Sequence, residues 1–535
     1  MRRALAALVA GLLLLLLAGV VARQLALARV EAVLRARGVE WGQRRSTLAS
    51  ATWVELRGPG VQLDRLELSA LPQPTVQLDG LTIELDALPL DTVDPDPLTP
   101  DTPPGGAGVG LTPSAVGVRD LSLRWRGETV LSGLSGSLLP EVDLRGPDGT
   151  VRRVEGRWQG QLRRRISLGP LRASVDLSVQ QDGETVLRFE ARSDDLVVEH
   201  PLLASAPVGP WSAGLRGSWD RSSGELLAEA ELNGLQATVR GTLQPGPLAA
   251  RLELQADELA FAEVIALFGE QIPEARRARC DGRLGISLEL SGPPLAWSAR
   301  PSAEDLACEG LLHDADALRS GTVRWRARQA DGSPMVASTG PGQPGFTPWL
   351  DGQRLADAFI ASEDIRFLSH PGYDLAAIQE AIDEAAAGEE RPRGGSTITQ
   401  QLAKNLYTGD DRTLVRKLRE LMYSLDLEAS LSKRHILQLY INIVELGPDL
   451  HGVGPAADLY FAKDARGLSD KEAAFLATLL PSPVSGHGRA SQGRVSEAKI
   501  EAILSTMERA RMRSPEQIAA ARRQRLVLLV QPPAP

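Results

Sequence analysis

The hydrophobic pattern of this chain changes period once, near residue 345, and that change limits the folds available to it. From about residue 48 to residue 330, apolar and polar residues alternate, as in segment 61–68. Alternation predicts antiparallel strands with one buried face. After the Pro- and Gly-rich stretch 333–347, apolar residues recur at helical spacing to about residue 525. The sequence therefore predicts a β-rich region followed by a mostly α-helical domain.

The amino terminus carries an apolar run, residues 4–22, that contains no charged residue. A run of this length nearly spans a bilayer core of about 30 Å. Arg2 and Arg3 precede it and place the amino terminus in the cytoplasm. We expect an uncleaved anchor, with the remainder of the chain outside. The alternative is a signal peptide cleaved after Val20-Val21-Ala22.

Composition excludes some classes of function. The net charge of −9 argues against a general nucleic-acid binder, and the cluster Arg163-Arg164-Arg165 is typical of a solvated strand edge. Cys280 and Cys308 are too few for a disulfide scaffold and are not spaced as metal ligands. In an exported chain they form either one disulfide or two buried free thiols.

These patterns divide the chain into five parts. They are a cytoplasmic tip and transmembrane anchor (1–24), a β-rich exported domain (25–332) with a Pro/Gly-rich loop (91–113), a linker (333–347), a helical domain (348–488) and a helical tail (489–535). Within the β-rich part, segment 260–268 is the best candidate for a helix. The tail would pack on the helical domain or contact the membrane.

The first candidate site segment contains the Glu363-Asp364 pair. We expect one helix to run through it, so that Glu363 and Phe367, four residues apart, share a face. An aromatic neighbour would partly desolvate the carboxylate and raise its pKa towards a value useful for proton transfer. Taken alone, such a pair is more typical of a solvated helix face.

Three further segments each predict a helix that carries polar groups on one side. Two glycines precede Ser396 and Thr397, and Thr397 with Gln400 fits a capping box at a helix start that suits an anion or a sugar. Arg416 and Lys417 lie one turn from Glu420, beside a predicted buried stripe of Leu414, Leu418, Leu421 and Leu425. Gln438 and Asn442 share a face of the last helix. Each segment alone is compatible with an ordinary capped or salt-bridged helix.

Together, in this order, the segments resemble glycosyltransferase family 51, the peptidoglycan-polymerising domain of class A penicillin-binding proteins and monofunctional transglycosylases. The resemblance rests on "EDIRFLSHPGYD", "RGGSTITQQLAKNLY", "RKLRE" and "ILQLYIN" and covers about 145 residues. It implies a lysozyme-like domain on the periplasmic or extracellular face of the cytoplasmic membrane. The middle region has a weaker resemblance, in texture only, to AsmA-like envelope proteins.

The resemblance also implies a reaction and a set of site residues. Lipid II would be added to a growing glycan strand by inverting displacement, with release of undecaprenyl pyrophosphate. Glu363 would be the general base, and Glu420 would organise the pyrophosphate and would be the residue to hold a divalent cation such as Mg²⁺; no cofactor is required. The implied substrate-binding residues are Asp364, His370, Ser396, Thr397, Gln400, Gln401, Lys404, Asn405, Arg412, Arg416, Lys417 and Asn442. The β-rich region would contact other envelope or cell-wall synthesis proteins.

The chain departs from the family pattern at a few positions, and two other functions stay open. Gln438 replaces a usual Glu, Gly454-Pro455 a usual Glu/Gln-Ala pair, and Ala462 a usual Gly. Ser430 and Lys433 read S-x-x-K, but no K-T-G follows, so we expect no transpeptidase site. A muramidase-like hydrolase would need no pyrophosphate-binding cations. A structural or lipid-handling envelope protein would use the β-rich region and leave the helical domain vestigial.

Overall fold

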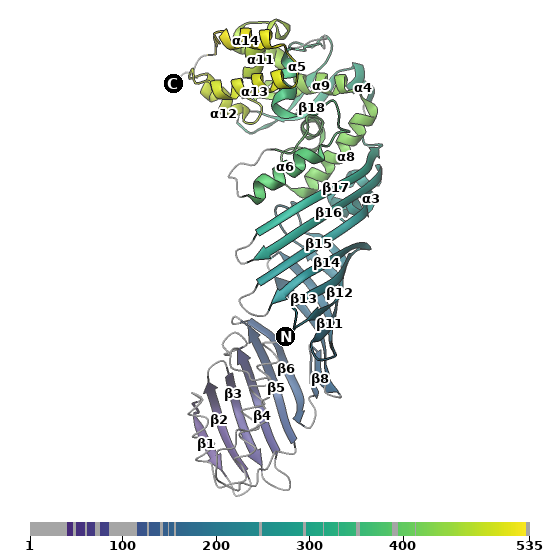
Figure 1. Cartoon of the computed structure of the whole chain (residues 1–535), viewed down its shortest axis with the longest axis vertical. Helices are drawn as coiled ribbons and strands as arrows, with labels where there is room; N and C mark the ends of the chain where they lie inside the picture. Colours follow the sequence, from purple (N-terminus) through teal and green to yellow (C-terminus); the bar gives the residue numbers. More distant parts are fainter. Residues whose placement is uncertain are drawn as a thin grey trace. The chain divides into compact units, whose positions relative to one another are not determined.

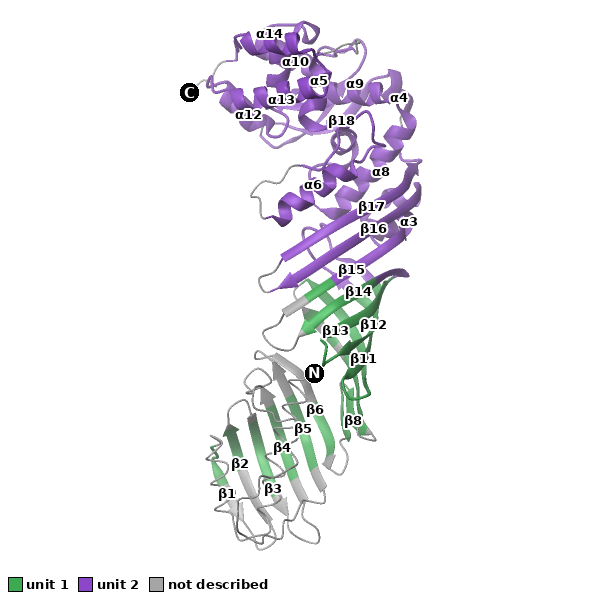
Figure 2. Cartoon of the chain, viewed as in Figure 1, with its two compact units in different colours: residues 1–196, 211–232, 238–252 green, residues 197–210, 233–237, 253–535 purple. Residues whose placement is uncertain are grey.

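The structure is a computed structural model of the 535-residue chain. The residues that it describes are 40–46, 50–58, 61–69, 75–84, 115–125, 128–139, 143–147, 149–154, 157–168, 170–244, 249–292, 296–313, 315–329, 331–348, 354–387, 394–411 and 413–530. The chain forms two compact units (Figure 2). Unit 1 comprises residues 1–196, 211–232 and 238–252, and unit 2 comprises residues 197–210, 233–237 and 253–535.

Unit 1 is built from β-strands, as the alternating pattern predicts (Figure 1). From β1 to β10, each strand pairs with the next in the chain, always antiparallel except for the parallel pair β4–β5. The strands are β1 (Gln43–Ser46), β2 (Ser50–Gly58), β3 (Val61–Ser69), β4 (Thr75–Glu84), β5 (Ala115–Trp125), β6 (Glu128–Leu139), β7 (Asp143–Gly146), β8 (Gly149–Val154), β9 (Arg157–Leu168), β10 (Leu171–Asp182) and β13 (Glu225–Leu232). Four more strands are shared between the units, β11 (Val186–Val198), β12 (Val208–Asp220), β14 (Leu235–Gln244) and β15 (Ala249–Ala260). The predicted loop 91–113 lies outside the described residues.

The buried leucines of unit 1 do not follow a strict period of two. On β4 the buried residues are Leu78 and Leu81, three apart, with Gly80 between them at a φ of +66°. On β5 Asp120 adopts a φ of +54° in the same way, between two buried positions. On β5 the register with β6 shifts around this residue, as in a β-bulge, whereas β4 keeps one register with β3 and the positive φ of Gly80 alone returns Leu81 to the buried face. Alternation therefore identified the strands but not the residues that face inward.

Unit 2 holds the rest of the β-rich region together with the helical domain. Its first elements are α3 (Phe261–Ala266), η2 (Gly269–Gln271), η3 (Pro273–Arg276), β16 (Arg279–Gly292), β17 (Ala296–Glu309), α4 (Ala315–Ser320), β18 (Val323–Arg328) and β19 (Pro334–Thr339). The helical domain follows with α5 (Arg354–Glu363), α6 (Leu375–Ala386), α7 (Ile398–Ala403), the π-helical turn η4 (Lys404–Thr408), α8 (Leu414–Ser430), α9 (Lys433–Ile443), β20 (Glu445–Gly447), β21 (Leu450–His451), α10 (Val453–Phe461), η5 (Ala465–Gly467), α11 (Asp470–Ala477), α12 (Pro483–Ala490), α13 (Glu497–Arg509) and α14 (Pro515–Arg523). The helix predicted over 260–268 is confirmed as α3.

The helical domain packs directly on the β-rich part of unit 2. Helices α6 and α8 lie against strand β17 (Figure 1). The leucine stripe predicted for α8 is only partly buried. Leu425 is buried, whereas Leu414 is 49% exposed. Instead the buried set includes the polar side chains of Glu420, Ser424 and Asp426. A pattern of apolar residues does not predict buried polar side chains, because these are buried only where they find hydrogen-bonding or charged partners.

The structure adds detail to the predicted linker and tail. Much of the predicted linker 333–347 is strand β19, which pairs antiparallel with β18. The tail packs on the helical domain: Ile500 and Leu504 are buried, and the Leu529 N–H donates to the Tyr460 carbonyl at 2.9 Å. Arg513 also donates to Asp470 at 2.8 Å.

The predicted anchor, residues 1–24, lies outside the described residues. Among the residues that the structure does describe, no helix has the length and apolar character needed to cross a bilayer.

Cys280 and Cys308 form a disulfide between directly opposed positions of β16 and β17. We expect replacement of Cys280 by Ser to lower the free energy of unfolding by about 3–4 kcal/mol, the chain-entropy value for a loop of this length. Thermal unfolding of the full chain with and without reductant measures the effect. Reductant should not change the transition of the Cys280→Ser variant. A wild-type transition that is insensitive to full reduction would contradict the expectation.

Candidate active site

Glu363 is the last residue of α5, not a residue in the middle of a helix. The chain turns at Asp364, so the prediction that Glu363 and Phe367 share a helical face is wrong. Phe367 is fully buried, and the Lys433 ammonium lies 4.5 Å from the centre of its ring. The helix ends here because the Asp364 side chain is engaged with groups outside α5, as described below.

The Glu363 carboxylate is half-buried and accepts two hydrogen bonds. Gln401 Nε2 donates to one oxygen at 2.9 Å, and Ser362 Oγ donates to the other at 3.0 Å. Tyr440 donates its hydroxyl to Gln401 Oε1 at 2.8 Å, which fixes the orientation of the amide. Burial raises the pKa of Glu363, the two hydrogen bonds oppose that rise, and the neighbouring Asp364 carboxylate adds to it. Such a group can hold a proton transiently near neutral pH.

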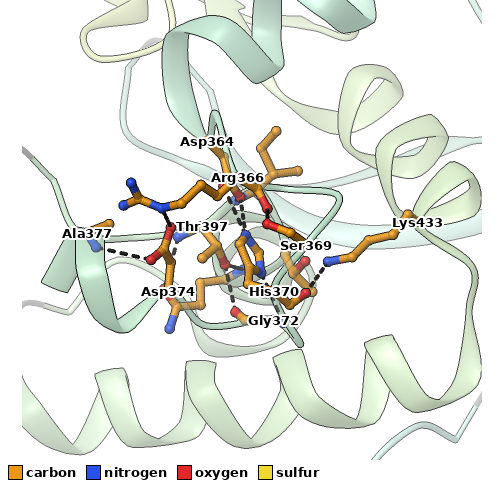
Figure 3. A network of polar contacts seen from close by, with 12 residues as sticks. Asp364, Arg366, Ser369, His370, Gly372, Asp374, Ala377, Thr397 and Lys433 are labelled. Carbon is orange, nitrogen blue, oxygen red and sulfur yellow. Dashed lines mark hydrogen bonds and ion pairs between the residues drawn. The ribbon is translucent and has the colours of Figure 1, made fainter. Parts of the chain in front are cut away.

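Asp364 lies beside Glu363 in sequence but has a different environment (Figure 3). It is 7% exposed and accepts from His370 Nε2 at 2.9 and 3.0 Å. The backbone N–H of Ile398, the first residue of α7, donates to the same carboxylate at 2.9 Å. Asp364 therefore joins the end of α5 to the start of α7. The resemblance implies that Asp364 and His370 bind substrate, but the structure places both in a buried, protein-contacting network.

The network continues from His370 to the cap of α7 (Figure 3). The Gly372 N–H donates to His370 Nδ1 at 3.2 Å, so Nε2 carries the proton that faces Asp364. Thr397 Oγ1 donates to the Gly372 carbonyl at 2.7 Å. Gly372 has a φ of +98°, and a Cβ there would lie 3.2 Å from the Ser424 carbonyl oxygen. A side chain at position 372 would therefore disturb the loop that holds His370.

Lys433 closes the network from helix α9. Its ammonium donates to the His370 carbonyl at 2.7 Å and to Glu428 at 2.8 Å. Ser430 instead donates to Asp426 at 3.2 Å. The S-x-x-K sequence therefore does not create a serine nucleophile beside a lysine base.

The predicted capping box at the start of α7 is confirmed. Thr397 accepts from the Gln400 N–H, and the Gln400 side chain accepts from the Thr397 N–H at 3.0 Å. Both side chains are buried, so their polar atoms serve the cap. The neighbours on either side, Ser396 and Gln401, contact the site instead.

Helix α8 carries the second carboxylate of the site. Glu420 is 1% exposed and forms ion pairs with Arg416 and, at 2.7 Å, with Lys417. Lys417 Nζ also donates to Ser396 Oγ at 2.7 Å. The buried Nε of Arg416 has no hydrogen-bond partner among the described residues. Two cations around one carboxylate leave a positive excess, of which the Lys417 ammonium is the more exposed part.

The Glu420 carboxylate does not fit the metal role that the resemblance allowed. Each of its oxygens is paired with a cation. Within the described part of the chain, no group of three or more metal-ligating side chains occurs. We therefore assign no step to a metal ion.

The remaining predicted site residues are dispersed. Lys404, where η4 begins, pairs with Asp410 at 3.0 Å, and Asn405 follows it in the same turn. Arg412 lies outside the described residues. Asn442 is buried, accepts from the Thr347 N–H at 2.7 Å and donates to the Thr347 carbonyl at 2.9 Å. It therefore fixes the entry of the chain into the helical domain.

The helical domain is similar in sequence to proteins of known family. Residues 352–508 match the model of the transglycosylase family, which extends past the predicted domain end at 488. A biosynthetic peptidoglycan transglycosylase of Acinetobacter baumannii (strain SDF) is 39% identical over 171 residues, which are 31% of this chain and 76% of the relative. This chain belongs to the peptidoglycan transglycosylase family.

Other relatives match the transglycosylase segment over a shorter length. Enzymes of the same name from Pasteurella multocida and Shewanella amazonensis are 48% and 51% identical, over 25% and 24% of this chain and 53% and 52% of their own lengths. The crystal structure of penicillin-binding protein 1A from Haemophilus influenzae superposes with a TM-score of 0.20 at 23% identity, covering 38% of this chain and 21% of that one.

Sequence reasoning missed three contributors to the transglycosylase site. Ser362 and Tyr440 reach the Glu363 carboxylate directly or through Gln401, and Lys433 supports the His370 loop. The hydroxyl of Tyr440 reaches Gln401 only because α7 lies beside α9. That placement is a tertiary contact between segments about forty residues apart, which local pattern does not encode.

Replacing Gln401 with Met removes the donor that stabilises the charged form of Glu363. The pKa of Glu363 should therefore rise further, and the acidic limb of the pH profile of kcat/KM should move to higher pH. Activity would be lost at acidic pH and largely regained at alkaline pH. Gln379→Met is the matched control, because Gln379 on α6 contacts Ala299 and Asp383. An unchanged or acid-shifted limb in the Gln401 variant would refute the assignment.

Proposed function

We propose that this chain polymerises lipid II into glycan strands, with Glu363 as the general base. Glu363 takes the proton of the acceptor 4-hydroxyl as that oxygen attacks the anomeric carbon of the donor. The bond from the anomeric carbon to the pyrophosphate oxygen breaks, and the pyrophosphate leaves with the electron pair. An unprotonated carboxylate whose pKa burial raises is suited to this role.

The observation that carries the proposal is the arrangement of two unlike carboxylates around one short helix. From within α7, Gln401 contacts Glu363. Just before the helix begins, Ser396 contacts Lys417, which pairs with Glu420. A base on one side and an excess of cations on the other is what displacement of an anionic leaving group requires. The inverting course needs no covalent intermediate.

The two cations also distinguish this function from hydrolysis of a finished glycan. A muramidase-like enzyme needs a protonating carboxyl group and a water site but has no pyrophosphate to hold. Arg416 and Lys417 would then have no substrate group to bind. In unit 1, a hollow on the sheet is lined by charged residues, among them Arg188 and Glu229, and by apolar ones, among them Phe189 and Leu227, so its lining does not by itself favour lipid handling.

Purified full-length protein supplied with lipid II tests the proposal. Wild type should form polymer and release undecaprenyl pyrophosphate, whereas Glu363→Gln should be slower by roughly 10²–10⁴-fold, the usual contribution of a general base. Equal polymer from both proteins would sink the assignment of the base. Shortening of preformed glycan by the wild type, without synthesis from lipid II, would favour the hydrolase.

We further propose that the chain is a single-pass protein of the cytoplasmic membrane with its catalytic domain on the outer face. The apolar run 4–22 and the preceding arginines support the anchor. In the turn after Glu363, Ile365 is 42% and Leu368 71% exposed, which suits a site that receives a lipid-linked substrate. Unit 1 would then be available to other envelope proteins.

Deletion of residues 2–24 should release the protein from the membrane pellet after an alkaline carbonate wash, whereas the full chain should stay in the pellet. Mass analysis of the amino terminus in the same fractions distinguishes an anchor from a cleaved signal. A full chain that is processed near Ala22 and recovered in the wash would overturn the anchor proposal.

A further inference from the structure

Helix α8 presents two different polar faces. Arg416, Lys417 and Glu420 belong to the active site. Arg419, Tyr423 and Asp426 form a second stripe that adjoins the first, because successive residues of an α-helix turn by about 100° and Tyr423 therefore lies almost two full turns after Arg416. At that spacing the second stripe lies about a quarter turn from Glu420. The second stripe contacts the β-rich part of unit 2 through Glu274, Arg277 and Leu311.

A buried ion pair holds the middle of this second face. Glu274 in η3 is only 7% exposed, and Arg419 donates to both of its carboxylate oxygens, from Nε to Oε2 at 3.0 Å and from Nη2 to Oε1 at 2.5 Å. The Tyr423 hydroxyl donates to the same carboxylate at 3.4 Å, and Arg277 donates to that hydroxyl at 3.4 Å. A bidentate pair of this kind sets orientation as well as distance.

The β-rich part also holds both ends of α8. The N–H groups of Leu414 and Val415 donate to the carbonyls of Leu202 and Leu203, at 2.8 and 3.0 Å. N–H groups in the first turn of a helix have no partner within the helix, so these carbonyls complete it immediately before Arg416. Near the other end, Asp426 Oδ2 accepts from the N–H of Leu311 at 2.7 Å.

These supports come from outside the segment that matches the transglycosylase family. Glu274 and the loop 200–204 precede residue 352, where the match begins. We propose that Glu274 is a positioning residue for the active site, which sets the rotation of α8 and thereby the placement of Arg416, Lys417 and Glu420. The proposal rests on the function proposed above. It makes the β-rich part of unit 2 a brace of the catalytic helix.

The brace can influence the rate because Arg419 and Glu420 are adjacent. A small rotation of α8 that relaxes the Arg419–Glu274 pair displaces the Glu420 carboxylate with it. Displacement of a catalytic group by about 1 Å can reduce a rate by as much as roughly 10²-fold. The effect requires no contact between Glu274 and the substrate.

The test compares Glu274→Gln with Glu270→Gln in the full-length protein. The first change preserves size and removes the charge that orients Arg419. The second removes the same charge four residues away, from a side chain that is 91% exposed and pairs only with Arg276. We expect Glu274→Gln to lower kcat on lipid II roughly tenfold, as loss of an orienting partner does elsewhere. The KM should change little, and Glu270→Gln should behave as wild type.

Hydrogen–deuterium exchange of segment 414–424 supplies a readout that does not depend on polymerisation. Exchange should be faster in Glu274→Gln than in Glu270→Gln, with the melting temperatures of both close to that of wild type. The reversed pair Glu274→Arg with Arg419→Glu should restore part of the rate and of the protection. If Glu274→Gln folds poorly, this double variant still tests whether the ion pair positions α8.

The outcomes separate the brace from the proposed function. Equal rates and equal exchange in the two Gln variants would overturn the brace, as would a loss of rate that follows only the folded fraction. Failure of the reversed pair to recover any rate or protection would also overturn it. Faster exchange of segment 414–424 in a protein that never polymerises lipid II would sustain the brace and remove the proposed function.

Discussion

The arrangement of the active site depends on the buried carboxylate of Asp364. It accepts from His370 and from the first N–H of α7, and so joins the end of one helix to the start of another. Glu363 precedes it by one residue, and Gln401 lies on the helix that it holds. The distance between the Glu363 carboxylate and its amide donor is therefore set by a neighbouring residue that is itself buried. A buried carboxylate can do this because its hydrogen bonds are shielded from water and hold a defined geometry.

Two adjacent carboxylates thus have separate roles because their surroundings differ. Asp364 is enclosed by donors, whereas Glu363 is half-exposed, and the pKa of Glu363 is raised by burial. The same separation recurs on α8, where Glu420 is enclosed by two cations. Helix α7 connects the two centres, since Ser396 contacts Lys417 and Gln401 contacts Glu363. A short helix that is capped reciprocally at its start is rigid enough to keep these contacts in register.

Local sequence patterns predicted several elements of the structure but not the long-range contacts that orient the candidate site residues. Alternation predicted the strands of unit 1, and the capping pattern predicted the start of α7, because both are local properties. The end of α5 at Glu363 was missed, since it depends on a bond from Asp364 to a residue 34 positions away. Asp364, His370 and Asn442 were interpreted as substrate ligands because a motif shows which residues recur and not whether they are buried. The bulges of unit 1 were missed because they need a positive φ at residues such as Asp120, which alternation does not encode.

The helical domain and the β-rich part of unit 2 are joined by polar contacts, and this explains why α8 has so few buried leucines. A helix covered on one side by a catalytic centre and on another by η3 and β17 can bury apolar residues only in between. Its inward positions therefore include Glu420 and Asp426, each with partners from a different part of the chain. Removing either partner would leave a buried charge unpaired, which is costly in a protein interior. The second face of α8 is consequently as constrained as the face that carries Glu420. The two are constrained by different partners: Glu420 by Arg416 and Lys417 of its own helix, and Asp426 by the N–H of Leu311 in the β-rich part of unit 2.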